Sequence, residues 1–422
     1  MNHSRFAIKG NIFYTPTPGE LCVCPESYLV CENGLVAGVY PQLPDAYKDI
    51  PVEDFGQKLI LPGLVDLHLH AAQFAYRGLG MDLELLDWLE ANAFPEECRF
   101  NNLDYAKSAY TLFAQQLKES ATTRACIFGT LHRPATLLLM ELLEQTGLHC
   151  FVGKVNMDRN SPDYLRETTQ ESLHETRRWL EECRHLSRSK PMLTPRFTPT
   201  CTDELMAGLS KLQQEFQLPF QSHLSENLPE IEWVKELCPG TEFYGEAYNQ
   251  FGLFGGSCPT VMAHCVWSGP EEQALMKENG VFIAHCPQSN MNISSGIAPV
   301  KKYLLDGQRV GLGSDVAGGA HLSLFRAMTD AIQCSKLRWR LVDQQLPALT
   351  MPEALYMATK GGGQLWGKVG SFEPGYAFDA IVMDDSQLPT TRTCTLAERL
   401  ERVVYLSDGL PTAKYVQGER LF

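Results

Sequence analysis

The segment Ile60-Leu61-Pro62-Gly63-Leu64-Val65-Asp66-Leu67-His68-Leu69-His70 is an apolar run that ends in two histidines. A run of this kind predicts a buried strand. Side chains two residues apart on a strand point the same way, so we expect His68 and His70 to face one metal ion together. A His-x-His pattern also occurs by chance in strands. The rest of the chain decides between these two interpretations.

Similar apolar runs recur along the middle of the chain and alternate with amphipathic helical stretches such as Asp203 to Gln217. That helix is expected to begin with a capping residue, and it carries Leu205, Leu209 and Leu212 at helical spacing. Strands alternating with helices indicate βα units around a parallel sheet, and eight of them predict an α/β fold, the (β/α)8 TIM barrel. The expected strands are residues 60–70, 122–129, 150–157, 192–198, 219–224, 261–266, 281–286 and 310–315.

The two ends of the chain have a different rhythm, in which short β-prone runs alternate with turn signals. Examples are Phe6 to Ile12, Tyr28 to Gly34, Ala380 to Met383 and Tyr415 to Leu421. This pattern predicts one small β-domain assembled from both termini. The expected boundaries are 1–61 and 372–422 for the two parts of that domain and 62–371 for the barrel.

The composition argues against several functional classes. With 36 basic and 50 acidic residues the net charge is −14, the wrong sign for binding nucleic acid or an anionic membrane surface. The first residues lack the apolar stretch of a signal peptide, and no segment offers about 18 consecutive apolar residues, so we expect no membrane span and a cytoplasmic protein. The 14 cysteines are scattered and form no Cys-x-x-Cys pair, which favours reduced thiols.

Five of the 11 histidines fall at or near the carboxyl ends of expected strands, where barrel enzymes place their catalytic groups. His223 ends the fifth strand and His264 ends the sixth, while Asp315 ends the eighth. Together with His68 and His70 they offer imidazole and carboxylate ligands suited to zinc. The alternative for Asp315 is a structural role, capping the turn that follows it.

Two further groups lie close to these strand ends. Glu226 follows His223 by three residues, where its carboxylate could reach a substrate held above the metal and act as a general acid and base. Without the neighbouring histidines, Glu226 would be interpreted as a residue at the start of a helix. His285 ends the seventh strand, but a fifth imidazole would overfill a catalytic zinc site, which keeps one position open for water. We therefore expect His285 to support the ligands from behind or to contact substrate.

The residues also test other zinc architectures. Binuclear barrel hydrolases need a bridging lysine at the end of the fourth strand, and residues 192–198 supply Arg196 instead. A mononuclear site follows. The base deaminases that combine His-x-Glu with Pro-Cys-x-x-Cys are excluded because neither motif occurs in this chain.

The chain resembles the guanine deaminases of the amidohydrolase superfamily over nearly its whole length. The His-x-His and the eighth-strand aspartate identify only the superfamily. More specific are the segments Leu85-Leu86-Asp87-Trp88-Leu89, Phe94-Pro95-Glu96-Glu97, Pro195-Arg196-Phe197, Gln221-Ser222-His223-Leu224-Ser225-Glu226-Asn227, Met262-Ala263-His264-Cys265 and Ala284-His285-Cys286-Pro287-Gln288-Ser289-Asn290.

This resemblance implies a barrel joined to a small β-sandwich domain formed by both termini, one zinc ion per subunit, a homodimer and guanine as substrate. It implies guanine contacts from Gln73, Arg196 and Phe197. One departure is Ala72, where the family commonly has Ser before that glutamine. The residues expected to contact the base are Gln73, Arg196, Phe197, His223, Glu226 and Asp315.

The expected reaction is hydrolytic deamination of guanine to xanthine and ammonia. The expected zinc ligands are His68, His70, His223 and Asp315. Zinc would lower the pKa of a water molecule, Asp315 would accept its proton, and Glu226 would protonate the neighbouring ring nitrogen. His264 either orients the attacking water or joins the metal ligands, and both options stay open.

Two alternatives to guanine deamination are considered. One is an amidohydrolase acting on another aminated heterocycle, such as a pterin, a triazine or an oxidised purine. The other is a barrel that has lost its metal and serves as a scaffold. The presence of Glu226 beside a complete ligand set argues against the scaffold.

Overall fold

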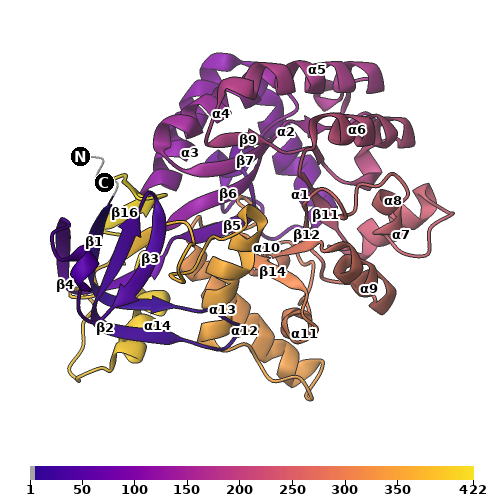
Figure 1. Ribbon diagram of the computed structural model, residues 1–422. Helices are drawn as coiled ribbons and strands as arrows, with labels where there is room; N and C mark the ends of the chain where they lie inside the picture. The colour runs from indigo at the N-terminus through magenta and orange to yellow at the C-terminus, as the bar shows by residue number, and fades with distance from the viewer. Residues whose placement is uncertain (1–4) are drawn as a thin grey trace.

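The computed structural model describes residues 5–422, so residues 1–4 of the expected segment 1–61 lie outside the described part (Figure 1). The strands are β1 (Arg5–Tyr14), β2 (Cys22–Glu32), β3 (Leu35–Tyr40), β4 (Val52–Pro62), β5 (Leu64–His70), β6 (Thr122–Phe128), β7 (His149–Gly153), β8 (Val155–Asn156), β9 (Ser189–Pro191), β10 (Thr194–Pro195), β11 (Phe220–Leu224), β12 (Thr260–His264), β13 (Phe282–His285), β14 (Arg309–Leu312), β15 (Ala380–Met383), β16 (Ala413–Val416) and β17 (Glu419–Arg420). The helices are α1 (Leu85–Trp88), α2 (Phe94–Cys98), α3 (Leu103–Glu119), α4 (Arg133–Thr146), α5 (Thr169–Glu182), α6 (Asp203–Phe216), α7 (Leu228–Leu237), α8 (Glu246–Asn249), α9 (Pro270–Asn279), α10 (Pro287–Asn292), α11 (Val300–Leu305), α12 (Leu324–Leu341), α13 (Met351–Tyr356) and α14 (Leu396–Leu406).

Parallel strands form the central sheet, in the order β11-β12-β13-β14-β5-β6-β7-β9. Backbone bonds connect its two edges, because Met192 N donates to Val152 O of β7 and Leu193 N donates to Pro219 O beside β11, each at 2.9 Å. Helices follow the strands along the chain, and α3 to α6 lie on the outside of the sheet (Figure 1). This is the TIM-barrel-like α/β arrangement that the alternating pattern predicts.

Three of the expected strands differ in extent from the structure. The run 60–70 is divided at Gly63, where β4 ends in another sheet and β5 begins. A Cβ atom on Gly63 would lie 2.3 Å from the Thr123 side chain, so only glycine allows this crossing. Residues 150–157 are likewise divided between two short strands, β7 and β8. Of the expected strand 192–198 only β10 (Thr194–Pro195) is present, and β9 (Ser189–Pro191) ends before it begins.

The position of Asp315 is also corrected by the structure. β14 ends at Leu312, so Asp315 lies three residues beyond the strand. The carboxylate of Asp66 accepts hydrogen bonds from Ser314 N at 3.0 Å and Ser314 Oγ at 2.5 Å. These hydrogen bonds from Ser314 to Asp66 take the chain out of the strand. Asp315 itself has φ +46°, in the left-handed region.

Helix α6 ends as the pattern predicts, but its cap is different. Thr202 is the capping residue, with its hydroxyl accepting from Leu205 N at 3.2 Å, so the helix begins one residue after the cap at Asp203. Gln217 follows the last turn in a left-handed conformation. Leu205, Leu209 and Leu212 are buried on the inner face, as their spacing predicts.

Strands from both termini form a second sheet, in the order β17-β16-β15-β4-β1-β2-β3. The N-terminal and C-terminal parts meet where β15 pairs antiparallel with β4, for example Ala380 with Pro62. Ile8, Leu29 and Val382 belong to one apolar cluster inside this sheet. Both ends of the chain thus share one hydrogen-bonded sheet, as their β-prone runs predict. A separate β-sandwich domain with the boundaries 1–61 and 372–422 stays a prediction.

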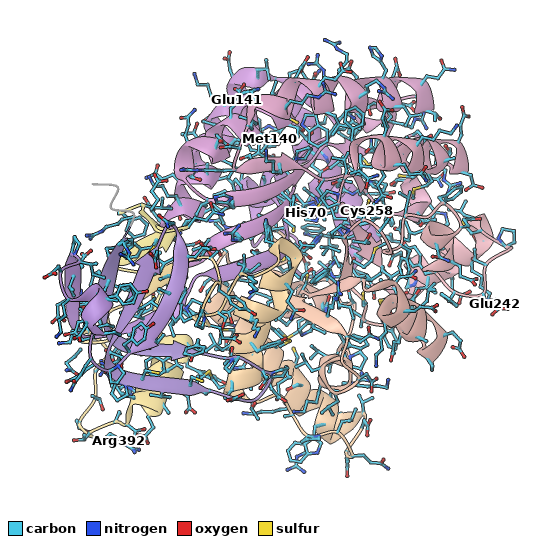
Figure 2. All side chains as sticks on the ribbon, in the orientation of Figure 1. His70, Met140, Glu141, Glu242, Cys258 and Arg392 are labelled. Atoms are coloured by element: carbon cyan, nitrogen blue, oxygen red, sulfur yellow. The ribbon has the colours of Figure 1, made fainter. Side chains whose placement is uncertain are left out.

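Among the described residues, no helix combines the length and apolar character needed to cross a membrane. All 14 cysteines are free. His70 lies near the middle of the molecule, where the carboxyl ends of the central strands meet (Figure 2).

Candidate active site

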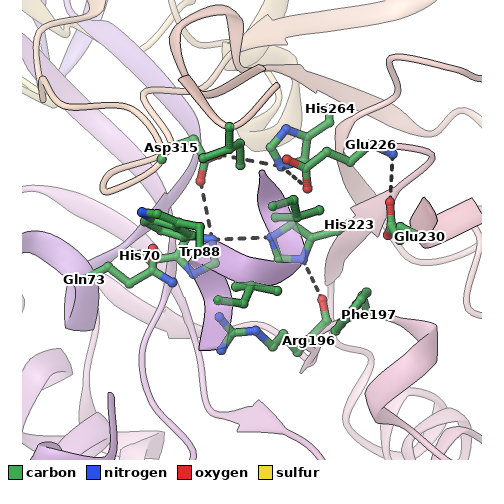
Figure 3. A pocket seen from close by; sticks show the side chains of 14 residues that line it. His70, Gln73, Trp88, Arg196, Phe197, His223, Glu226, Glu230, His264 and Asp315 are labelled. Carbon is green, nitrogen blue, oxygen red and sulfur yellow. Dashed lines mark hydrogen bonds and ion pairs between the residues drawn. The ribbon is translucent and has the colours of Figure 1, made fainter. Parts of the chain in front are cut away.

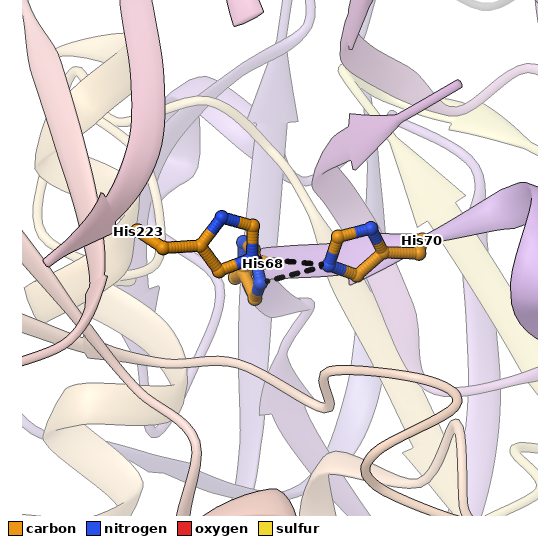
Figure 4. Close-up of side chains that lie close together, drawn as sticks. All are labelled: His68, His70 and His223. Carbon is orange, nitrogen blue, oxygen red and sulfur yellow. Dashed lines mark hydrogen bonds between the residues drawn. The ribbon is translucent and has the colours of Figure 1, made fainter. Parts of the chain in front are cut away.

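Three histidines converge at the carboxyl ends of β5 and β11. Nε2 of His70 lies 3.2 Å from Nε2 of His68 and 3.4 Å from Nε2 of His223 (Figure 4). Asp315 Oδ1 completes the cluster at 3.2 Å from His68 Nε2 and 3.4 Å from His70 Nε2. The residues that sequence spacing placed at one metal are therefore brought together.

The protonation state of the cluster suits metal binding. His223 Nδ1 lies 2.6 Å from the carbonyl oxygen of Arg196, which can only accept, so Nδ1 carries the proton and Nε2 keeps its lone pair. Burial, followed by the neighbouring imidazoles, lowers the pKa of His70 and His223 well below the ordinary value. Neutral imidazole is the form of histidine that binds metals.

The separations in this cluster can be compared with a metal centre. Two ligands about 2.1 Å from a tetrahedral zinc ion lie about 3.4 Å apart. The measured separations of 3.2 to 3.4 Å match that value. Unprotonated nitrogen atoms this close to one another and to a carboxylate oxygen are held most favourably by a cation between them. His68, His70 and His223 therefore fit a single ion, and Asp315 lies at ligand-to-ligand distance from His68 and His70.

His264 lies on the other side of Asp315. Its Nε2 is 3.3 Å from Glu226 Oε2 and 3.7 Å from Asp315 Oδ2 (Figure 3). Its Nδ1 is 2.9 Å from Asn290 Oδ1. His264, His68 and Asp315 form a second group close enough to hold a metal. The geometry leaves both roles of His264 available, as ligand or as partner of Glu226.

The surroundings of Glu226 and Asp315 shift the pKa values of the two carboxyl groups in opposite directions. Burial and then the charge of Asp315 raise the pKa of Glu226 well above the ordinary value, although Ser295 Oγ donates to its Oε1 at 3.0 Å. Burial opposes ionisation of Asp315 too, but the charge and hydrogen bond of His68, with the other imidazoles, outweigh it and hold that pKa low. One carboxyl is thus a proton donor and the other a proton acceptor.

The pocket above this cluster has about 420 Å³ of space, part of which is open to solvent. Its wall contains apolar side chains, among them Trp88 and Phe197, and polar groups that face them across the space (Figure 3). A concave pocket with apolar walls and a few convergent polar groups is typical of a small-molecule site. The lining residues are His70, Gln73, Leu85, Trp88, Leu89, Arg196, Phe197, His223, Glu226, Glu230, His264, Ile293, Asp315 and Gly318.

All six residues expected to contact the base line this pocket. Gln73 lies on the short helical turn Ala71–Tyr76 after β5, while Arg196 and Phe197 follow β10. Gln73 and Arg196 are almost completely buried. Ala72, the departure from the family pattern, is buried next to Gln73 and does not line the pocket.

His285 is placed behind the site. It is buried at the end of β13, it does not line the pocket, and neither ring nitrogen has a hydrogen-bond partner among the described residues. Burial, followed by the charge of His264, lowers its pKa to about 3. This position suits the expected supporting role better than contact with substrate.

Sequence reasoning assigned no role to two buried carboxylates beside the pocket. Glu97 accepts hydrogen bonds from Gln73 and Arg196, and Glu230 accepts from Glu226 N, Asn227 N and the Tyr244 hydroxyl. Glu97 lies in the segment 94–97 that resembles the family, so the sequence drew attention to its position but did not indicate its function. For Glu230 the sequence offered one indication, because it is the third residue of α7 and completes a capping box there.

Strain concentrates at this end of the central sheet. Ser225, His264, Cys265 and Asp315 all have positive φ, between +45° and +73°, although none is glycine. Such conformations cost free energy and cluster at functional sites. They turn the chain sharply after strands β11 and β12 and after β14.

Known proteins resemble this chain along its length. A family model for the amidohydrolase family matches residues 59–420. A guanine deaminase from Dictyostelium discoideum is 36% identical, covering 98% of this chain and 97% of its own length, and one from Escherichia coli is 34% identical, covering 90% and 86%. The crystal structure of a guanine deaminase from C. acetobutylicum, with guanine bound in the active site, has a TM-score of 0.96 at 47% identity and covers 99% of this chain and 100% of its own. The chain therefore belongs to the amidohydrolase family, in the branch formed by the guanine deaminases.

Proposed function

We propose that this protein hydrolyses guanine to xanthine and ammonia. The observation that carries the proposal is the pocket itself, which is lined by buried Arg196 and Gln73, by imidazoles, and by two carboxyl groups whose pKa values are shifted in opposite directions. Relatives that share this chain's length are named guanine deaminases, and one of them binds guanine in its active site.

We propose one zinc ion per chain, held by His68, His70, His223 and Asp315. Four of their six pairwise separations match those of ligands that share one zinc ion, which supports this assignment. When bound, zinc supplies Lewis-acid chemistry that lowers the pKa of water toward neutrality. His264 is assigned as a partner of the attacking water, because its Nε2 lies between carboxyl oxygens of Glu226 and Asp315.

The protein's own groups move the protons. Water adds to the ring carbon that bears the amine, and ionised Asp315 accepts the proton that the water loses. Protonated Glu226 donates to the adjacent ring nitrogen, which removes the aromatic stabilisation as the new C–O bond forms. Protons then pass back to the amine, the C–N bond breaks, and ammonia leaves. The opposite shifts of the Glu226 and Asp315 pKa values support these roles.

The substrate wall favours a base with acceptors along one edge. Arg196 carries only donors, and a guanine presents a carbonyl oxygen at position six that can meet them. Phe197 offers an aromatic face to a planar ring. Adenine has an amino group at position six, so the donors of Arg196 would face another donor.

Finer features of the architecture and assembly belong to the same proposal. A closed eight-stranded barrel is supported by the bonds that Leu193 and Met192 make to both sheet edges. A β-sandwich built from 1–61 and 372–422, with 62–371 as the barrel, is supported by the apolar cluster shared by Ile8, Leu29 and Val382. We also propose a homodimer, from the family resemblance, and a cytoplasmic location, which the free thiols favour.

Release of ammonia from guanine by the purified protein tests the proposed function. We expect turnover of guanine, and much slower or no turnover of adenine, a pterin or an aminated triazine. Faster turnover of a pterin or triazine than of guanine would reassign the substrate but keep the hydrolase. No turnover of any aminated heterocycle by metal-loaded protein would favour the scaffold.

A further inference from the structure

The carboxylate of Glu97 lies between the two polar residues that face the base. Its Oε1 accepts from Gln73 Nε2 at 2.8 Å and its Oε2 accepts from Arg196 Nη1 at 2.5 Å. Glu97 is 2% exposed and does not line the pocket itself. We propose that Glu97 is a positioning residue that determines the substrate specificity of this site, an inference that rests on the proposed function.

Glu97 fixes which way the Gln73 amide points. Gln73 Oε1 accepts from the backbone N–H of Ala317 at 3.2 Å, while Nε2 donates to Glu97. A carboxylate offers only acceptors and a backbone N–H offers only a donor, so the opposite amide orientation would place two mismatched pairs in a buried site. The second N–H of Gln73 is left for a ligand.

The same carboxylate holds the guanidinium of Arg196. The backbone of Arg196 is already fixed, because its N–H donates to Asn156 O at 3.2 Å and its carbonyl accepts from His223 Nδ1. Only the side chain is free to move, and Glu97 neutralises its charge and holds Nη1. The remaining guanidinium N–H groups lie on the Gln73 side of the pocket (Figure 3).

Both contacts come from one short element. Glu97 lies on α2, and the ring of Phe94 on the same helix lies 5.1 Å from Arg196 Cζ. α2 thus orients base-facing residues that come from two distant segments, after β5 and after β10. The result is a row of N–H donors that matches a ligand edge made of acceptors, such as the carbonyl edge of guanine.

The neighbouring glutamate provides a matched control. Glu96 forms an ion pair with Arg99 at 2.9 Å and also accepts from the Tyr105 hydroxyl, away from the pocket. Glu96→Gln makes the same chemical change one residue earlier in the same helix. It should leave the base-facing residues as they are.

Glu97→Gln removes one acceptor without changing the shape of the side chain. The new amide has one acceptor oxygen and one donor nitrogen, so it can satisfy Gln73 or Arg196 but not both. Either Gln73 turns over and meets the Ala317 N–H with a donor, or Arg196 loses its partner. In both cases the row of donors toward the base is disturbed, while the proposed metal ligands keep their own partners.

The experiment compares guanine with 2-aminopurine, which carries the same amine but no carbonyl at position six. For Glu97→Gln we expect kcat/KM for guanine to fall by about 10²-fold, mainly through KM, and that for 2-aminopurine by less than about 10-fold. Metal content should stay at the wild-type value. Glu96→Gln should match the wild type on both substrates.

The outcomes separate the two proposals. If wild type does not deaminate guanine, the proposed function fails and this inference fails with it. If wild type is active but Glu97→Gln keeps the wild-type ratio of guanine to 2-aminopurine, only the role of Glu97 is overturned. Should that variant not fold, Glu97→Asp keeps the charge but withdraws both oxygens by one methylene, and it should lower the ratio by about 10-fold. An unchanged ratio in Glu97→Asp then overturns the role.

Discussion

The two ends of the central sheet both bury charged groups, but they treat them differently. At the amino end, Arg124 Nε donates to Asp379 Oδ2 at 2.7 Å, and Lys414 Nζ donates to the carbonyl oxygens of Lys118 and Thr122 at 2.6 and 2.9 Å. At the carboxyl end, ring nitrogens of His68, His70 and His223 and a carboxylate oxygen of Asp315 lie together, with separations of 3.2 to 3.4 Å. We call the amino end saturated because each of these charged side chains has a protein partner, although Arg124 Nη2 makes no hydrogen bond. We call the carboxyl end unsaturated because its ring nitrogens and carboxylate oxygen face one another.

This difference indicates that the amino end of the sheet serves stability and the carboxyl end serves function. The saturated groups join β6 to the terminal sheet, since Asp379 precedes β15 and Lys414 lies on β16. Groups whose lone pairs lack donors, on strained backbone, have no structural reason to be buried together and are arranged for a ligand. We therefore expect variants at the carboxyl end to lose activity and variants at the amino end to lose stability.

The largest loss of activity is expected from substituting His223 at the unsaturated carboxyl end of the sheet. His223→Ala should lose the metal, and turnover should fall by about 10⁴-fold or more, because no ion remains to lower the pKa of water. Elemental analysis and guanine turnover measure both effects. The exposed His174→Ala is the control and should keep one ion per chain. Two ions per wild-type chain would contradict the mononuclear site.

A smaller loss is expected from Glu226→Gln. The amide keeps the shape of the side chain but has no acidic proton, so turnover should fall by about 10²- to 10⁴-fold while metal and substrate still bind. Steady-state kinetics and metal analysis test this, with exposed Glu232→Gln as the control. Turnover close to that of wild type would remove Glu226 from the reaction.

Arg196→Ala tests the substrate wall without touching the metal. The substitution keeps the backbone carbonyl that accepts from His223 Nδ1, so metal content should not change. Guanine turnover should fall by about 10²-fold, and wild type should prefer guanine over adenine by about 10⁴-fold. Progress curves with both bases measure this, and exposed Arg166→Ala serves as control. Full guanine activity in Arg196→Ala would refute the purine assignment.

The unsaturated end was largely predictable from the sequence. His68 and His70 face one way because strand side chains alternate, and His223 and His264 follow because parallel strands end together. These are local rules, so they need no knowledge of distant contacts. The error at Asp315 has a tertiary cause, since Asp66 takes Ser314 out of the strand from 248 residues away.

The partners that saturate buried groups could not be predicted in the same way. Glu97 pairs with Arg196 across 99 residues, and Lys414 bonds to Thr122 across 292. No spacing rule connects such positions, because the pairing depends on how the helices and the terminal sheet pack against the barrel. The sequence therefore predicted residues that line the pocket, such as Arg196, but not the partners that hold them in place.

The smallest expected effect concerns the saturated end, at Lys414. The side chain is completely buried, and burial lowers its pKa to about 7 from an ordinary value near 10.5. Between these two pH values the unfolded chain binds a proton that the folded chain has released. The free energy of unfolding contributed by this group therefore rises with pH from about 7 to about 10.5, by at most about 1.4 kcal/mol per pH unit.

Lys414→Met removes this titration and leaves the catalytic groups unchanged. The difference in Tm between wild type and Lys414→Met should shift in favour of wild type by about 1–2 °C per pH unit between pH 7.5 and 9. The value of kcat for guanine at 25 °C should stay within about 2-fold, because the amino end of a barrel serves stability. Exposed Lys336→Met should show no such pH dependence. A pH-independent Tm difference for Lys414→Met, or a large loss of kcat without loss of fold, would contradict the division of roles between the two ends of the sheet.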